Sequence, residues 1–228
     1  IFYRIGSMRN MKTWLLPLCL LTVGTLLSAG QHDWPQFRGQ QASGVATGLA
    51  TPTTWDVEHD TNIRWKTPIP GLAHSSPIIW GNRAYVQTAH GGGNAELKVG
   101  LYGNIKSVDE KEDQSWRLLA LDKTTGTVVW DTLALKRQPQ VKRHTKATHC
   151  NSTPATDGKH IVALFGSEGL FCFDTNGRLI WNRDLGPMDS GYYKVKTAQW
   201  GFASSPVIYN GKVIIQCDVQ ENSFVAAF

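Results

Sequence analysis

Cysteine is scarce in this chain, with four residues in 228, and no two cysteines are adjacent. Cys19 lies in an apolar segment near the amino terminus. The other three are Cys150, Cys172 and Cys217, an odd number that cannot all pair within the chain. Because Cys172 and Cys217 lie in strand-like runs, we predict that they are small core residues. A single disulfide is the alternative, since an exported compartment permits one.

Compact metal-binding motifs are also lacking. Neither Cys-x-x-Cys nor His-Glu-x-x-His occurs in the sequence. The nearest approach to a ligand cluster is His144, His149 and Cys150, and no further residue completes a tight spacing around them. We therefore predict no metal site.

An excess of charge is missing as well. The formal net charge is +5, but Arg4, Arg9 and Lys12 precede residue 31 and no acid does, so the remainder carries 20 minus 18, or +2. This balance gives no reason to expect nucleic acid as a partner. Two local charge runs are predicted to be solvated loops, with an anionic ligand as the alternative for the first: the basic cluster Lys136, Arg137, Lys142, Arg143 and Lys146, and the run 109–113 within a long insertion between Ala89 and Arg117.

The longest apolar run, Trp14–Leu27, is short for a membrane span and contains Pro17 and Gly24. Lys12 precedes it and Ser28-Ala29-Gly30 follows it, the arrangement of a secretory signal. We predict upstream read-through over residues 1–10, a signal peptide over 11–30 and cleavage near Gln31. The expected product is periplasmic or secreted, with no transmembrane anchor after cleavage.

A repeat of about 52 residues dominates what the sequence does contain. A Ser/Thr-Pro step opens each copy, at Pro77, Pro154 and Pro206. Pro154 and Pro206 are 52 residues apart, as are Asp122 and Asp174. Each copy has short β-rich runs separated by glycine-containing turns; in the first these are Pro77–Trp80, Ala84–Thr88, Leu118–Asp122 and Thr127–Trp130. Four strands per period near fifty residues predict an all-β fold, a β-propeller of four-stranded antiparallel blades.

Three residues recur around the last turn of each copy. Asp122 and Asp174 favour a tight turn, Gly126 and Gly177 tolerate positive φ, and Trp130 and Trp181 end the strand that follows. A single blade cannot bury both faces, so we predict that the two tryptophans are buried between stacked blades, at equivalent places. The alternative, ordinary tryptophans of a β-sandwich core, is disfavoured because sandwiches rarely repeat at this length.

The stretch 120–130 (Ala-Leu-Asp-Lys-Thr-Thr-Gly-Thr-Val-Val-Trp) resembles the A-x-D-x-x-T-G-x-x-x-W tryptophan-docking motif of pyrroloquinoline-quinone (PQQ)-type propeller repeats, and 172–181 is similar to a copy shortened by one residue. Other stretches resemble a secreted, planctomycete-type group of PQQ-like propellers: 33–39, 62–68, 74–77 and 165–170. The resemblance covers nearly everything after residue 33. It specifies the fold strongly and the activity poorly, because the repeat residues are structural.

The predicted organisation is a lead-in over 31–61 and a partial propeller over 62–228. The segment Asn62–Lys66, with Trp65, is typical of a last blade strand without its partners, and the third repeat stops at Phe228 before its aspartate. We expect an amino-terminal piece holding about two blades and parts of others, from a ring of seven or eight.

Connections into successive blades crowd round one end of a propeller channel, which makes His74, Asn151 and Trp200 the best candidates for a ligand-facing rim. The favoured alternative is that the Ser and Thr hydroxyls of these connections cap backbone groups. The resemblance implies PQQ, calcium and a carboxylate base for a dehydrogenase, and in alcohol-type members a vicinal cysteine pair lies against the cofactor. This sequence has no such pair, and none of its residues matches the calcium ligands or the base.

We therefore expect no catalytic, cofactor-binding or metal residues and no bound cofactor. The predicted function is an exported, non-catalytic binding or scaffold module, similar to the propeller component of the outer-membrane β-barrel assembly machinery. Its partner would be a protein or cell-envelope ligand. The alternative is a periplasmic PQQ-dependent alcohol or sugar dehydrogenase with PQQ and calcium.

Overall fold

The computed structural model describes residues 33–91, 97, 107–192, 195–219 and 222–228. The predicted read-through segment and signal peptide lie outside the described residues. Within the described part of the chain, no helix has the length and apolar character needed to cross a membrane. Apart from two short 3₁₀ helices, η1 (Gln40–Ala42) and η2 (Gly166–Glu168), the regular elements are all strands.

The first repeat folds into one four-stranded antiparallel sheet, here called blade 1. Its strands occur in chain order, β1-β2-β4-β5. The register pairs Ile79 with Ala84, and β2 pairs with β4 along its whole length. The bounds are β1 (Ile78–Trp80), β2 (Arg83–Gly91), β4 (Gln114–Asp122) and β5 (Val128–Arg137).

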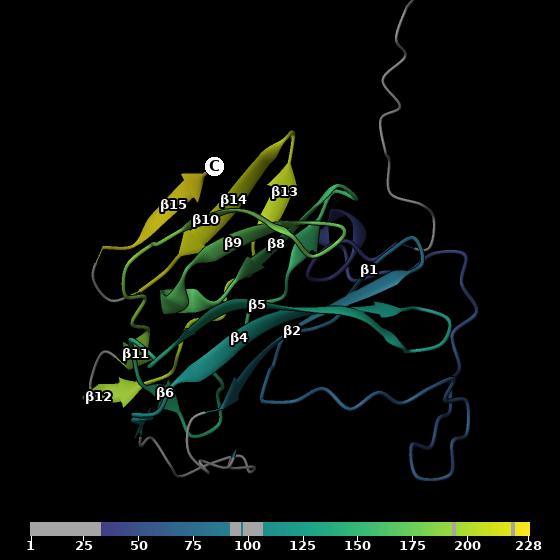
Figure 1. Cartoon of the computed structure of the whole chain (residues 1–228), viewed down its shortest axis with the longest axis horizontal. Coiled ribbons are helices and arrows are strands. Elements are labelled where there is room, and N and C mark those ends of the chain that lie inside the picture. The colour runs from purple at the N-terminus through teal and green to yellow at the C-terminus, as the bar shows by residue number, and fades with distance from the viewer. Residues whose placement is uncertain (1–32, 92–96, 98–106, 193–194, 220–221) are drawn as a thin grey trace, which may run out of the picture.

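The second repeat forms an equivalent sheet, blade 2, and the third forms the three-stranded blade 3. Figure 1 shows the three sheets following one another, from β1–β5 through β7–β10 to β13–β15. The bounds are β7 (Ala155–Thr156), β8 (His160–Leu164), β9 (Leu170–Asp174), β10 (Leu179–Arg183), β13 (Val207–Tyr209), β14 (Lys212–Cys217) and β15 (Phe224–Ala227). An all-β fold of antiparallel, sequentially stacked blades confirms the predicted class, an incomplete propeller.

Side chains on alternate faces of the strands build the cores between blades. On β4, Trp116, Leu118 and Ala120 face blade 2, and they join Ile161 and Phe173 in the core between blades 1 and 2. A second core lies between blades 2 and 3 and contains Val162, Leu164, Leu170, Cys172, Val213, Ile215 and Cys217. The predicted core role of the cysteines is confirmed, because all three are buried and free.

Three strands of blade 1 are longer than the sequence predicts. β2 continues to Gly91, β4 begins at Gln114 and β5 continues to Arg137, all toward the same end of the sheet. The 9-residue ladder between β2 and β4 includes polar residues such as His90 and Ser115. They interrupt the alternation of apolar and polar residues from which a strand is predicted. The insertion between β2 and β4 is correspondingly shorter than expected.

The glycine turns receive the tryptophan of the preceding blade. Trp130 Nε1 donates a hydrogen bond to the Thr175 carbonyl at 3.0 Å, and its ring covers Gly177, where an added Cβ would lie 2.8 Å from the indole. Trp65 makes the same contact one blade earlier, donating to the Lys123 carbonyl at 3.0 Å and covering Gly126. We call 122–127 and 174–178 the docking turns.

Each docking turn is fixed by its aspartate. Asp122 Oδ1 accepts from the backbone N–H groups of Thr124 and Thr125 at 2.9 and 3.0 Å. Asp174 Oδ1 accepts from those of Asn176 and Arg178, both at 2.9 Å. These bonds hold the φ > 0 glycine of the turn under the incoming indole.

The prediction that both repeat tryptophans are buried is only partly right. Trp130 and Trp181 are half-buried. Trp130 packs against the core between blades 1 and 2 and against Gly177. Trp181 contacts the core between blades 2 and 3, and the guanidinium of Arg183 lies 5.6 Å from its ring centroid. Among the described residues, no docking turn lies against Trp181.

The lead-in is part of the propeller rather than a separate segment. Trp34 forms an antiparallel bridge with Ile79 of β1. The Asn62–Lys66 segment contributes Trp65 as expected, but it is assigned to no strand in the described structure because it pairs with no neighbouring strand.

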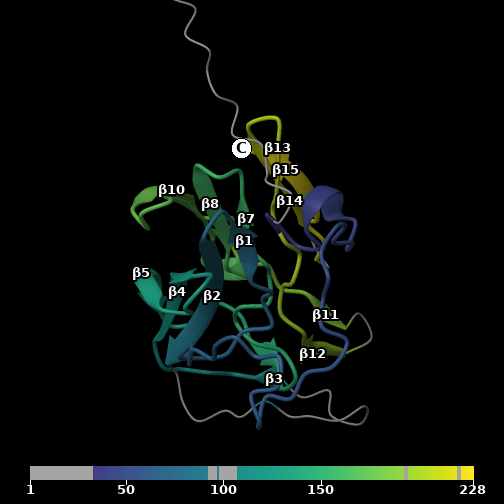
Figure 2. The ribbon, with the colours of Figure 1, turned by 90° about the vertical axis from the view of Figure 1, so that its right-hand side faces the viewer.

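Two pairs of short strands lie at one end of the blades: β3 (Ser107–Val108) with β6 (Arg143–His144), and β11 (Gly191–Tyr192) with β12 (Val195–Gln199). The strand directions place the connections between blades at this end as well, and the docking turns at the other. Figure 2 shows β3, β11 and β12 below the three sheets. We call the two ends the connector end and the turn end.

Candidate functional site

The Ser/Thr-Pro steps form a relay of hydrogen bonds across the three blades. The Ser76 N–H donates to Thr153 Oγ1 at 3.0 Å, and the Thr153 N–H donates to Ser205 Oγ at 2.9 Å. These three residues occupy the same position in each repeat, immediately before the proline. The hydroxyls thus cap backbone groups of the preceding blade, rather than of their own.

The three rim candidates lie at the connector end, where backbone contacts link their surroundings. His74 is exposed, and its backbone N–H donates to the Cys150 carbonyl at 2.9 Å. Trp200 is 40% exposed and stacks on His144, with ring centroids 4.2 Å apart.

Asn151 has a structural part in the connection. Its Oδ1 accepts from the N–H and the hydroxyl of Thr148, at 3.0 and 2.8 Å. Its Nδ2 donates to the Phe202 carbonyl at 3.2 Å, in the connection to blade 3. With its amide engaged on both sides, Asn151 fastens two consecutive connections together.

A buried ion cluster corrects the two predictions of solvated charge runs at one residue of each run, while most of the other residues in the runs are exposed. Arg143 and Glu110, from the basic and acidic runs respectively, have side chains only 1% and 7% exposed. Two bonds join them: Arg143 Nη2 to Glu110 Oε1 at 2.7 Å, and Arg143 Nε to Glu110 Oε2 at 3.1 Å. The β3–β6 ladder brings the two runs together, since Val108 pairs with Arg143.

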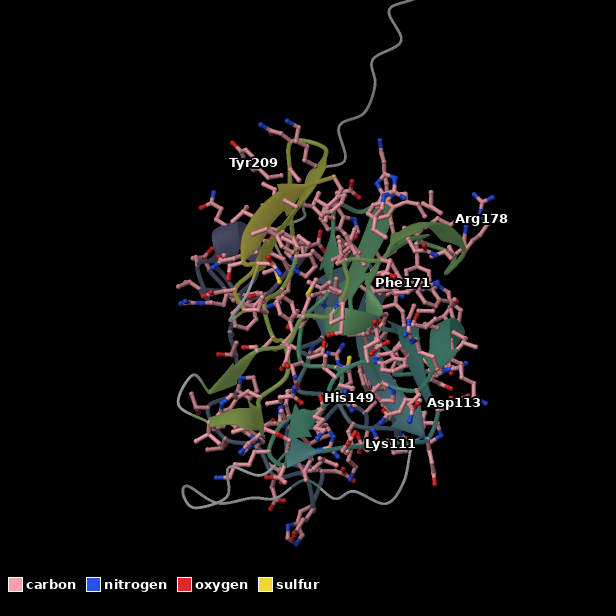
Figure 3. All side chains as sticks on the ribbon, turned by 90° about the vertical axis from the view of Figure 1, so that its left-hand side faces the viewer. Lys111, Asp113, His149, Phe171, Arg178 and Tyr209 are labelled. Atoms are coloured by element: carbon pink, nitrogen blue, oxygen red, sulfur yellow. The ribbon has the colours of Figure 1, made fainter. Side chains whose placement is uncertain are left out.

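His149 completes this cluster. Its Nε2 lies 2.7 Å from Glu110 Oε2, and its side chain is 7% exposed. Gln114 Nε2 donates to the same oxygen at 3.1 Å, and Trp116 Nε1 donates to the His149 carbonyl at 3.0 Å. Figure 3 shows His149 at the connector end with Lys111 and Asp113, away from Arg178 and Tyr209 at the turn end.

The electrostatics of the cluster favour an ionised Glu110. Burial acts to raise the pKa of this carboxyl, but the hydrogen bonds and charges of His149 and Arg143 lower it to about 2. A carboxylate of that acidity does not accept a proton at neutral pH. Glu110 is therefore an ion-pair partner of Arg143 and not a general base.

Two other basic residues of the run also have acidic neighbours. Lys142 Nζ lies 3.4 Å from Asp109 Oδ2, and Arg137 Nε lies 3.4 Å from Glu168 Oε2. At these two positions the acids offset the positive charge locally.

Glu168, in η2, is the acid with the most distinctive environment. Its side chain is 3% exposed, and Oε1 accepts from the Gln140 N–H at 2.8 Å. Burial raises the pKa of Glu168, although that hydrogen bond and the charge of Arg137 oppose the change. Glu168 and His149 line one small cavity of about 20 Å³, which has room for about one water molecule.

The sequence missed Glu110, Arg143 and Glu168 as buried partners. Glu110 and Arg143 are 33 residues apart, and each lies in a run of charges that normally indicates a solvated loop. The one usable signal was the position of both runs at the same end of blade 1, before β4 and after β5.

The residues around the ion cluster do not fit a calcium and quinone site. Glu110 and Asn151 are committed to internal bonds, and the cavity beside Glu168 is far smaller than the several hundred Å³ of a cofactor pocket. Within the described ranges, no three His, Cys, Asp or Glu side chains converge closely enough to hold a metal ion. The three cysteines are separate, and burial raises the pKa of each thiol, to about 11 for Cys172.

Solved structures similar to this chain include a quinohemoprotein alcohol dehydrogenase (ADHIIG) from Pseudomonas putida HK5, at 17% identity and TM-score 0.39, over 72% of this chain and 20% of that one. A europium-containing methanol dehydrogenase gives 13% identity and TM-score 0.39, over 72% and 24%. BamB from Moraxella catarrhalis gives 16% identity and TM-score 0.27, over 51% and 30%. The chain thus spans less than a third of the length of each.

No curated protein matches the sequence significantly. A family described as outer membrane protein assembly factor BamB matches residues 35–227, a range that begins in the lead-in, next to Trp34, and extends to the end of β15. This match covers most of the chain and all three blades. The chain belongs to this BamB-like family of PQQ-type propeller repeats.

Proposed function

We propose that the protein is an exported, non-catalytic propeller that binds a protein or cell-envelope ligand as a scaffold. The observation that carries this proposal is the buried Glu110–Arg143–His149 cluster at the connector end. The buried charged side chains at this end, where ligands of propellers usually bind, fasten connections to one another. The cluster thereby stabilises a fixed surface.

The family supports the same proposal. Its description names an assembly factor for outer membrane proteins, which is a role in organising other proteins at the cell envelope. The predicted signal peptide over 11–30 agrees with such a location, and we propose that the mature protein is periplasmic or secreted.

A PQQ-dependent alcohol or sugar dehydrogenase is the second candidate. One feature favours it: Glu168 is a buried carboxyl with a raised pKa that lines a cavity with His149, a combination found at acid–base sites. The tryptophan-docking repeats do not decide between the candidates, because their residues make structural contacts.

The test is cofactor loading. The protein is expressed with its own signal, purified from the exported fraction, and incubated with PQQ and calcium. We expect no stoichiometric PQQ absorbance after desalting and no reduction of an artificial dye with alcohols or sugars. A PQQ band that co-purifies with the protein, or dye reduction that depends on an alcohol, would establish the dehydrogenase instead.

A further inference from the structure

The first strand of each blade has a backbone edge that faces away from its sheet, and in blade 1 the lead-in occupies it. The Trp34 N–H donates to the Ile79 carbonyl at 2.8 Å, and the Ile79 N–H donates to the Trp34 carbonyl at 2.9 Å. Asp33 Oδ1 extends the contact by accepting from the Gly81 N–H at 2.8 Å. The lead-in thus adds a short extra strand to β1.

Blade 2 repeats this arrangement with the next residue of the lead-in. The Thr156 N–H donates to the Pro35 carbonyl at 2.8 Å. Thr156 and Ile79 are equivalent in the repeat, each two residues after the proline that opens the blade. Two adjacent residues of one extended segment therefore satisfy the same backbone position in two consecutive blades.

Ile208 is the equivalent residue of blade 3, two residues after Pro206. It lies opposite Val213 in the β13–β14 ladder, but the N–H and carbonyl of Val213 both bond to Phe228 on the other side. The Ile208 pair is therefore a non-hydrogen-bonded one, and its own N–H and carbonyl face the open edge. Among the described residues, no hydrogen bond engages either group.

A groove of about 330 Å³ lies beside this edge. The lead-in forms one wall with Gln36 and Phe37, and Ser204 and Ser205 contribute from the connection into blade 3. From blade 3 itself come Val207, Ile214, Gln216 and Val225, on the face turned away from blade 2. Phe37 and Val207 are 51% and 38% exposed, so the groove offers apolar surface to an incoming side chain. Figures 1 and 2 both show the lead-in turn with η1 next to β13 and β14.

We propose that the open edge at Ile208 binds an extended polypeptide segment of a partner protein. The segment pairs its backbone with the Ile208 N–H and carbonyl and places an aromatic side chain in the groove beside Phe37. An extended segment is the expected occupant because the groove continues from the lead-in. There the extended pair Trp34-Pro35 makes the corresponding backbone hydrogen bonds with Ile79 and Thr156. This inference rests on the proposed scaffold function and names the kind of partner.

The test uses a fluorescently labelled peptide with the sequence of residues 33–39 and a matched pair of variants of the full chain. Ile208→Pro removes the edge N–H, which takes no part in the β13–β14 ladder, and Ile208→Ala removes most of the same side chain but keeps the N–H. In anisotropy titrations we expect Ile208→Ala to bind the peptide at least about fivefold more tightly than Ile208→Pro, the effect of one lost hydrogen bond.

Hydrogen exchange locates the binding. In the free protein the Ile208 amide should exchange faster than those of Ile79 and Thr156, and saturating peptide should protect it. Equal affinity of the two variants would overturn the proposal. So would peptide binding that changes exchange at Ile79 and Thr156 but not at Ile208, since the peptide would then replace the lead-in. Neither result bears on cofactor loading, so failure here is distinct from failure of the proposed function.

Discussion

The two ends of the blades are built on different principles. At the turn end, Trp65 over Gly126 and Trp130 over Gly177 make one contact twice, with the same hydrogen bond of 3.0 Å. At the connector end, the hydroxyl relay is the repeated contact of the described connections, and buried charges fasten them. The repeated end sets how blades stack, while the irregular end gives the protein its individual surface.

The energetics of the two ends also differ. An indole over a glycine removes apolar area from water without desolvating a charge. The Glu110–Arg143 pair takes two ions out of water, which is costly unless both remain fully bonded. The connector end should therefore tolerate loss of one partner poorly, and the turn end should depend on shape. The experiments below test this contrast, from the largest expected effect to the smallest.

Removing Arg143 should have the largest effect. Arg143→Ala leaves Glu110 buried without its bidentate partner, and we expect the free energy of unfolding to fall by about 3–5 kcal/mol. The control is Lys142→Ala, which breaks the exposed 3.4 Å contact with Asp109 and should cost less than about 1 kcal/mol. Urea denaturation measures both, and similar losses for the two variants would show that the cluster is not a special feature.

Acid should weaken the same cluster. The folded pKa of Glu110, about 2, lies below its ordinary value of 4.5, so its ionisation stabilises the folded state fully above about pH 4.5. That contribution, about 3 kcal/mol, should disappear as pH falls toward 2. Urea titrations between pH 2 and 6 would show it, and Glu110→Gln should flatten the curve. Burial raises the pKa of Glu168, so its contribution has the opposite sign and should remain in that variant.

At the turn end, shape can be tested with one methyl group. Gly177→Ala places a Cβ 2.8 Å from the Trp130 ring at φ +82°, whereas Gly211→Ala meets nothing within 4 Å at φ +71°. Both variants bear the cost of positive φ, about 1 kcal/mol, and only Gly177→Ala must also displace the indole. We expect a further loss of about 1–2 kcal/mol for Gly177→Ala. Equal thermal stabilities would contradict a docking role for Trp130.

The smallest effect concerns one hydrogen bond. Trp130→Phe loses the bond from Nε1 to the Thr175 carbonyl, and we expect a cost of about 1 kcal/mol beyond the change in packing. Trp181→Phe is the matched control, because no hydrogen bond of the Trp181 indole occurs among the described residues. A Trp181→Phe variant as destabilised as Trp130→Phe would show that packing alone accounts for both.

The turn end was predictable from the sequence because its residues repeat. A spacing of about 52 residues aligned Asp122 with Asp174 and Gly126 with Gly177, and the physical roles of those residue types gave the turns and the stacking. The docking tryptophan Trp65 was also recognised, although its segment forms no strand in the described structure. The degree of tryptophan burial was not predictable, since it depends on which turn, if any, covers each ring.

The connector end was not predictable for a physical reason. The bond between Glu110 and Arg143 depends on a two-residue ladder, β3–β6, that has no periodic signal. Solvated loops and buried ion pairs use the same residue types, and only tertiary contacts distinguish them. The open edge at Ile208 required the register of β13, β14 and β15 together, because the direction of its N–H follows from the pairing of Val213 with Phe228.

The hydroxyl relay has a direction along the chain. Ser76 needs the hydroxyl of Thr153, and Thr153 needs that of Ser205, so each backbone N–H depends on a side chain synthesised later. Trp130 likewise packs on the turn around Gly177, which is synthesised later. Because a chain emerges from its amino terminus, each blade completes its bonds only after its successor has appeared. The blades therefore cannot be completed one at a time during synthesis. The blade synthesised last keeps an unpaired backbone N–H and an uncovered indole until the next blade has folded.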